Sequence, residues 1–144
     1  VAREGLAEWN DVFCEQGVFT PAESRAILDA GKPLGLRPRI HADELALSGG
    51  ALTAAAVGAV SADHLIRVDE AGAAALAESG VVATLLPAAA FFLKLGRYAP
   101  ARMLIERGVP VALATDMNPG GGFSPSMPFV VALAAFAVKK LQDA

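Results

Sequence analysis

Two histidines and one aspartate occupy equivalent places in this 144-residue sequence. His41, His64 and Asp116 each stand at the end of a segment that predicts a β-strand, where barrel enzymes place their catalytic groups. Imidazole and carboxylate groups together suit a borderline divalent ion such as zinc or iron(II), and they leave a position for water. A single histidine is more often a hydrogen-bonded structural residue, but the three residues together predict a metal centre.

Two carboxylates, Asp43 and Glu44, follow His41 within one turn. A carboxylate beside an acidified water molecule can accept a proton and later deliver it to a leaving nitrogen. We expect Glu44, rather than Asp43, to move protons in this way. The alternative is that both residues simply begin a helix, where acidic side chains interact favourably with the positive end of the helix dipole.

The elements that must position these residues follow one repeated pattern. A helical stretch ends near a glycine, and an apolar run then leads to a polar or turn residue. Glycine tolerates the left-handed conformation that ends a helix, and a short apolar run bounded by turn residues is typical of a buried strand. The predicted strands cover residues 35–40, 58–63, 81–86 and 109–115, with a fifth at 11–15.

Helices are predicted in the intervals between the strands. Thr20 and Glu23 have the spacing of a capping box, and Pro21 suits the first helical position, so a helix is expected to reach about Ala30. Further helices are expected over residues 52–57, 69–78, 100–106 and 127–141. Strands that alternate with helices predict a parallel α/β sheet with right-handed crossovers.

Two architectures fit this alternation. One is a partial (β/α)8 TIM-type barrel that contains about strands 4 to 8, and the other is an open doubly wound sheet. The sequence has no Gly-x-Gly-x-x-Gly after a strand and no Gly-Lys-Ser/Thr loop, so nucleotide binding by an open sheet has no support. The glycine-rich stretch 119–122 has no lysine after it and is interpreted as a flexible active-site segment.

The composition argues against several classes of function. The sequence is 54% hydrophobic, yet its apolar stretches are interrupted before the roughly 18 residues that a membrane helix needs. A net charge of −3 without a basic run argues against nucleic acid as a partner. The single cysteine, Cys14, cannot form an internal disulfide and the amino terminus does not resemble a signal peptide, so the cytoplasm is expected.

The two ends of the sequence predict a segment of a longer protein. The first residue is Val1 rather than Met, and the last residues continue a helical pattern. We therefore expect residues 1–144 to be a single segment of a catalytic barrel, truncated at both ends.

Three motifs resemble the imidazolonepropionase family of the amidohydrolase superfamily. They are His41-Ala42-Asp43-Glu44, Ala62-Asp63-His64-Leu65 and Ala114-Thr115-Asp116-Met117-Asn118-Pro119-Gly120. Their order and spacing resemble strands five, six and eight of that family's barrel, and residues 11–15 resemble its fourth strand. The similarity extends from about Asp11 to Lys140 and implies the carboxyl-terminal half of the barrel.

The resemblance implies a role for each site residue. His41 and Asp116 would bind one divalent metal ion, zinc or iron, and Asp116 would also contact the attacking water. Glu44 and His64 would handle protons and orient the substrate. The loop residues implied to contact the substrate are Asn118 and Gly120. The implied reaction is hydrolysis of 4-imidazolone-5-propanoate to N-formimidoyl-L-glutamate in histidine degradation.

The sequence also departs from the family. It lacks the superfamily's first-strand His-x-His pair and the upstream basic and aromatic groups that hold the propionate, as expected if strands one to three lie outside it. Ala88 follows Pro87 where the family often has glycine, which narrows the backbone freedom there. The expected partners are a small-molecule substrate, the missing amino-terminal half of the same protein and further copies in a homo-oligomer. The isolated segment is expected to be inactive.

Two alternatives stay open. Another cyclic-amide amidohydrolase or a deaminase, such as a cytosine-deaminase-like or dihydroorotase-like enzyme, could place the same residue types on the same strands, although Asn118-Pro119-Gly120 argues against it. The second alternative is a non-catalytic half barrel that self-associates. Its open strand edges and apolar interior would require a partner.

Overall fold

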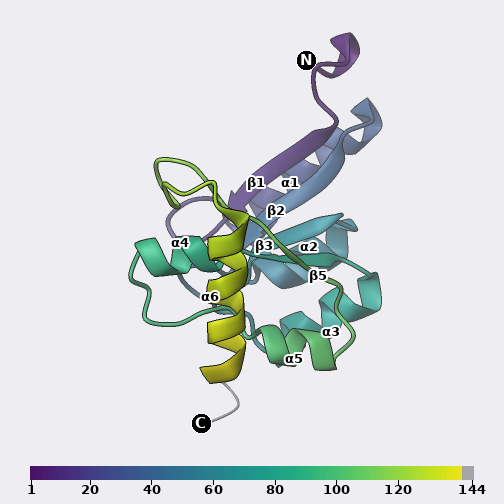
Figure 1. The fold of residues 1–144 in the computed structure, drawn as a ribbon. Helices are drawn as coiled ribbons and strands as arrows, with labels where there is room; N and C mark the ends of the chain where they lie inside the picture. Colours follow the sequence, from purple (N-terminus) through teal and green to yellow (C-terminus); the bar gives the residue numbers. More distant parts are fainter. Residues whose placement is uncertain (141–144) are drawn as a thin grey trace.

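The fold is a five-stranded parallel sheet with helices between its strands (Figure 1). The computed structural model describes residues 1–140. The strands are β1 (Trp9–Cys14), β2 (Arg37–Ala42), β3 (Ser61–His64), β4 (Val82–Leu85) and β5 (Val111–Leu113). The helices are α1 (Pro21–Gly31), α2 (Gly50–Val57), α3 (Glu70–Ser79), α4 (Pro87–Phe92), α5 (Ala101–Glu106) and α6 (Met127–Lys140), with short 3-10 turns η1 (Ala2–Glu4) and η2 (Lys32–Leu34).

The strand order decides between the two predicted architectures. Each strand pairs in parallel with the next strand of the chain, in the order β1-β2-β3-β4-β5. A doubly wound sheet reverses its strand order at a switch point, whereas the wall of a (β/α)8 barrel keeps the sequential order. The predicted α/β class and partial barrel are therefore confirmed.

The two faces of the sheet differ in polarity because strand side chains alternate. On β1 and β2, the side chains of Val12, Cys14, Ile40 and Ala42 are buried on the face covered by helices. They belong to one apolar core that also contains buried leucines of α1, α3 and α5, namely Leu28, Leu76 and Leu104. The intervening residues of both strands are more exposed and include Asp11, Phe13, Arg39 and His41. The polar groups of interest thus lie on the opposite face from the helical core.

Side-chain capping interactions mark the amino-terminal ends of two predicted helices. The Thr20 hydroxyl accepts a hydrogen bond from the backbone N–H of Glu23, and the Glu23 carboxylate accepts one from the N–H of Thr20. This capping box confirms the predicted start of α1. Asp69 caps α3 in a similar way by accepting from the N–H of Gly72. The end predicted for the last helix, Leu141, lies outside the described residues.

Three features differ from the predicted elements. Helix α4 follows β4 directly, where no helix is predicted. Strand β5 covers only Val111–Leu113, so residues 114 and 115 belong to the connection that leads to Asp116. Helix α2 begins at Gly50, so Asp43 and Glu44 lie in a loop and do not begin a helix. These differences fall at the carboxyl ends of strands, where irregular segments form the site.

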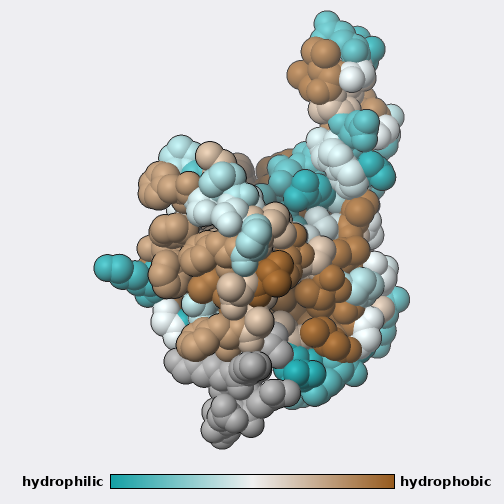
Figure 2. Space-filling view, viewed as in Figure 1, coloured by the Kyte–Doolittle hydropathy of each residue, from teal (hydrophilic) through white to brown (hydrophobic). Residues whose placement is uncertain are grey.

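The helices α4 and α6 pack against each other on one side of the molecule (Figure 1). Apolar side chains gather over this side in the space-filling view (Figure 2). Large exposed apolar residues of the two helices include Phe91, Phe92, Met127, Val131 and Phe136. Within residues 1–140, none of the helices has the length and apolarity needed to cross a membrane.

Candidate active site

One cavity of about 530 Å³ lies at the carboxyl ends of the strands and is lined by all six predicted site residues. They are His41, Glu44, His64, Asp116, Asn118 and Gly120. The remaining lining residues, such as Phe13, Leu45, Leu93 and Leu95, are mostly apolar. A small number of polar groups converging in an apolar cleft is typical of a ligand-binding site. The structure thus brings together residues that are as far as 79 positions apart in the sequence, counted from 41 to 120.

Unusual backbone conformations orient two of these side chains. His64 has φ 73° and Asp116 has φ 52°. Both values lie in the left-handed backbone region, which residues other than glycine rarely adopt. Such residues cost free energy, and they cluster at functional sites where the surrounding structure holds them. His64 also ends β3, so the turn in the chain begins at the site residue itself.

Glu44 and His64 form a buried pair. Nδ1 of His64 lies 3.4 Å from Oε1 of Glu44, and only 3% and 9% of the two side chains is exposed. The two atoms do not form an aligned hydrogen bond, so the contact is a close approach of the two groups. Burial raises the pKa of Glu44 to about 6, with a further contribution from the charge of Asp116. Burial also lowers the pKa of His64 to about 3, assisted by the charge of His41.

The imidazole of His41 is held by Asp11. Nδ1 of His41 lies 3.1 Å from Oδ1 of Asp11, and this hydrogen bond is the main cause that raises the pKa of His41. The His41 ring also meets the Phe13 ring edge-on at a centroid distance of 5.9 Å, and the His64 ring at 5.3 Å. These contacts limit the rotation of the ring beside the cavity.

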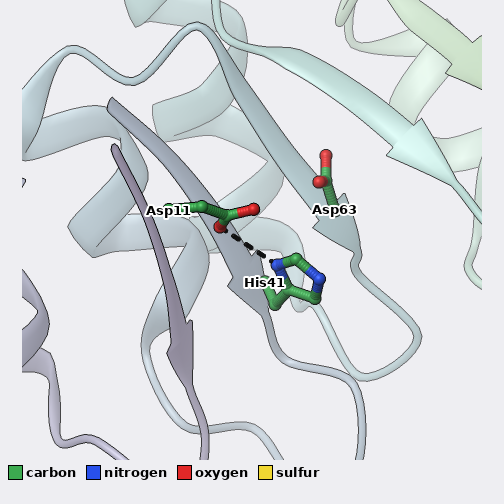
Figure 3. A group of neighbouring side chains, drawn as sticks. All are labelled: Asp11, His41 and Asp63. Atoms are coloured by element: carbon green, nitrogen blue, oxygen red, sulfur yellow. Dashed lines mark hydrogen bonds and ion pairs between the residues drawn. The ribbon is translucent and has the colours of Figure 1, made fainter. Parts of the chain in front are cut away.

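A second carboxylate, Asp63, lies close to His41 (Figure 3). Ligand atoms of Asp11, His41 and Asp63 lie within 4.8 Å of one another, which would suit a metal ion by distance. However, Oδ2 of Asp63 accepts a hydrogen bond from Nη2 of Arg39 at 2.9 Å. A guanidinium group at this distance repels a divalent cation, so we interpret Asp63 as the partner of Arg39.

Asp116 is held by the loop that follows it. The amide Nδ2 of Asn118 donates to Oδ1 of Asp116 at 2.7 Å, while Oδ1 of Asn118 accepts from the backbone N–H groups of Gly120 and Gly121 at 2.7 and 2.6 Å. A methyl group at Gly121 would collide with the Asp116 carboxylate. Burial raises the pKa of Asp116. The predicted flexible segment is thus internally hydrogen-bonded around its aspartate.

Two carboxylates not predicted as site residues hold the loop that carries Glu44. Asp43 is completely buried and accepts hydrogen bonds from Ser48 and from the N–H groups of Gly49, Gly50 and Ala51. Glu15, directly after β1, accepts from the N–H groups of Glu44 and Leu45. The placement of acidic residues directly after buried strands is the only sequence signal for these roles.

Solved structures share this fold. An amidohydrolase from a Sargasso Sea environmental sample aligns with a TM-score of 0.67 and 22% identity over 92% of this chain and 30% of its own. An adenosine deaminase from Xanthomonas campestris with bound zinc aligns with a TM-score of 0.68 and 20% identity over 88% of this chain and 31% of its own. By fold, the chain is part of a (β/α)8-type barrel, as its sequential parallel strands also indicate.

Sequence comparison finds relatives that are much more similar to this chain than the solved structures are. The chain is 58% identical to the imidazolonepropionase of Geobacillus thermodenitrificans over 139 residues, which are 96% of this chain and 32% of that protein. It is 57% identical to the imidazolonepropionase of Shouchella clausii over 139 residues, 96% of this chain and 31% of that protein. The chain thus matches imidazolonepropionases over nearly its whole length and spans about a third of theirs. No protein-family model matches it.

Proposed function

We propose that the protein carrying this chain hydrolyses a cyclic amide with the help of one divalent metal ion, opening 4-imidazolone-5-propanoate to N-formimidoyl-L-glutamate. The observation that carries the proposal is the convergence of His41, Glu44, His64 and Asp116 on one cavity. The similarity to imidazolonepropionases supports this choice of substrate.

The donor set in the cavity fits such an ion. His41 offers a ring nitrogen and Asp116 offers a carboxylate, both of which are ligands for zinc and for iron(II). A catalytic zinc site typically has about three protein ligands, so these two would form part of the set. When bound, the ion would supply Lewis acidity, which acidifies water and polarises a carbonyl group.

Glu44 is the proposed proton carrier. A carboxylate with a pKa of about 6 is mostly ionised at neutral pH, yet it is basic enough to accept a proton from water. The oxygen of that water adds to the ring carbonyl carbon, the bond from this carbon to the ring nitrogen breaks, and the nitrogen receives the proton. Glu44 can mediate both transfers from one position.

His64 is the proposed orienting residue for the substrate ring. Its lowered pKa keeps the imidazole neutral at physiological pH, so it can donate one hydrogen bond and accept another. The loop residues Asn118 and Gly120 form part of the cavity wall and are proposed to contact the substrate. Because Asn118 already bonds Asp116 and the loop amides, this wall would be formed before the substrate arrives.

The experiment is a turnover assay of the complete protein, loaded with zinc or iron(II) and compared with the chelated protein. The substrates are 4-imidazolone-5-propanoate, a small panel of other cyclic amides, and amino-substituted bases for which ammonia release is followed. Metal-dependent formation of N-formimidoyl-L-glutamate alone is expected. Preferential turnover of another compound would favour the alternative amidohydrolase or deaminase, and no turnover at all would favour a non-catalytic half barrel.

A further inference from the structure

We propose that Asp11 is a positioning residue that fixes His41 as the Nδ1–H tautomer, so that Nε2 is the nitrogen available to a divalent ion in the cavity. This role rests on the proposed function for the identity of the ion's site. Neither the metal chemistry nor the similarity to other proteins assigns any task to Asp11.

The first step is the direction of the hydrogen bond. An ionised carboxylate only accepts hydrogen bonds, so the contact of 3.1 Å between Asp11 and Nδ1 requires the imidazole to donate from Nδ1. A neutral imidazole carries one proton. Its other nitrogen, Nε2, then bears the free lone pair, and it lies on the side of the ring away from Asp11 (Figure 3). Metal ligation by histidine is commonly supported by such a carboxylate on the second nitrogen.

The second step is the rigidity of the arrangement. Asp11 and Phe13 stand two residues apart on the same face of β1, and Phe13 is the register partner of His41 on β2. The carboxylate of Asp11 therefore fixes one edge of the imidazole, while the Phe13 ring packs against it from the same strand. Because both contacts come from a strand rather than a loop, they locate Nε2 accurately before any ion binds.

The neighbouring Asp63 supports the same assignment. If Asp11, His41 and Asp63 themselves held the ion, it would lie near the Arg39 guanidinium. Since Asp63 is only 4% exposed and is paired with Arg39, its charge is already balanced. Asp63→Asn should therefore leave the metal affinity nearly unchanged, whereas a site built on the three residues would lose a ligand.

The test measures metal affinity and the His41 tautomer in the complete protein. Zinc affinity is obtained by chelator competition for the wild type, Asp11→Ala, Asp11→Asn, Asp63→Asn and the control Asp29→Asn. Asp29 is an exposed residue of α1 whose substitution changes the charge equally. We expect the two Asp11 variants to lose about 10- to 100-fold in affinity, as for other residues that support a metal ligand. The control should match the wild type.

The tautomer is read from imidazole ¹⁵N chemical shifts of the metal-free protein at alkaline pH, with His41→Gln used to assign the signal. We expect the Nδ1–H form in the wild type and a mixture in Asp11→Ala. Asp11→Asn should not rescue affinity despite its shape, because its amide can donate to Nδ1 and favour the opposite tautomer, as in the His–Asp pair of serine proteases. A purely structural role would instead make Asp11→Asn milder than Asp11→Ala.

The outcomes separate this role from the proposed function. A wild type that binds zinc through the Nδ1–H tautomer but does not hydrolyse 4-imidazolone-5-propanoate would disprove the substrate and leave the role of Asp11 intact. Unchanged affinity in both Asp11 variants, or an Nε2–H tautomer in the wild type, would overturn the role of Asp11. Loss of zinc in Asp63→Asn would point to the three-residue site instead. A complete protein that takes up no divalent ion would overturn both proposals.

Discussion

Nδ1 of His64 lies 3.4 Å from Oε1 of Glu44, and burial shifts the pKa values of these two groups in opposite directions. The pKa of the carboxylic acid rises to about 6, and that of the imidazole falls to about 3. At neutral pH the pair is therefore a carboxylate beside a neutral ring. Pairs of titratable groups with environments that separate their pKa values often divide acid–base roles between them.

The substitution Glu44→Gln is expected to reduce kcat by roughly 10²- to 10⁴-fold, the usual contribution of general acid–base catalysis. The amide keeps the shape of the side chain but cannot accept a proton. Metal content should stay at the wild-type level, since Glu44 is not a proposed ligand. Glu106→Gln, on the exposed side of α5, is the matched control. A near wild-type rate in Glu44→Gln would assign the proton transfer to another group.

The pH dependence of kcat/KM should show an acid limb governed by Glu44. Because the carboxylate is the active form, the rate should increase as the pH rises through about 6, the raised pKa of this group. In Glu44→Gln this limb should disappear from the residual activity. An acid limb centred near 4.5, the ordinary pKa of glutamate, would show that burial does not act on Glu44 in the working enzyme.

Metal content should separate the ligands from the proton-handling pair. His41→Ala and Asp116→Asn each remove a proposed ligand and should lower the metal bound per protein, as measured by elemental analysis after dialysis. His64→Ala should keep the metal and lose turnover, because its ring faces Glu44 and the proposed substrate. Equal metal loss in all three variants would indicate a collapse of the site rather than loss of ligands.

The Asn118 loop should matter through Asp116. Asn118→Ala removes the partner of Asp116 Oδ1 and the acceptor for two loop amides, so metal affinity should fall by about 10- to 100-fold. Gly121→Ala should have a similar effect, because its methyl group would displace the carboxylate. Ser124→Ala, in the same connection but without a contact to Asp116, is the control. If Asn118 acted only on the substrate, KM would rise while metal affinity stayed unchanged.

The 144-residue polypeptide by itself should bind zinc weakly and hydrolyse 4-imidazolone-5-propanoate negligibly. It carries two proposed ligands, His41 and Asp116, whereas a typical catalytic zinc site has about three. Its outer strands and exposed apolar side chains should also lead it to self-associate. Light scattering and a rate measurement, with and without a polypeptide that carries the remaining strands, test this. A fully active monomer would contradict it.

Much of the fold could be predicted from the sequence because local signals and tertiary packing agree. The capping box at Thr20 and the left-handed glycines at Gly58 and Gly80 mark helix ends that the structure retains. Helix α4 could not be predicted in this way. Its residues are apolar throughout and no side chain caps its start at Leu86, so neither periodicity nor a capping residue marks it. The order of the strands depends on pairing between residues far apart in the sequence, so local sequence patterns do not determine it either.

The site shows the same division. His41, His64 and Asp116 could be found because they follow apolar strands, and the structure places them around one cavity. The supporting carboxylates could not be assigned from sequence. Asp11 bonds His41, which is 30 positions away in the sequence. Asp43 directly follows a buried strand, but this position alone does not show that its carboxylate accepts from the backbone N–H groups of the loop that follows.

The left-handed backbone at Asp116 has a consequence for protein engineering. A residue other than glycine in this conformation costs roughly 1 kcal/mol or more, and burial further opposes the charge of the carboxylate. Asp116→Gly would relieve both penalties at once. Selection for heat resistance alone is therefore expected to favour glycine at this position. The most heat-resistant variants would then lack the carboxylate of the candidate site. Any stabilisation campaign on this scaffold should hold residue 116 fixed and screen for turnover alongside melting temperature.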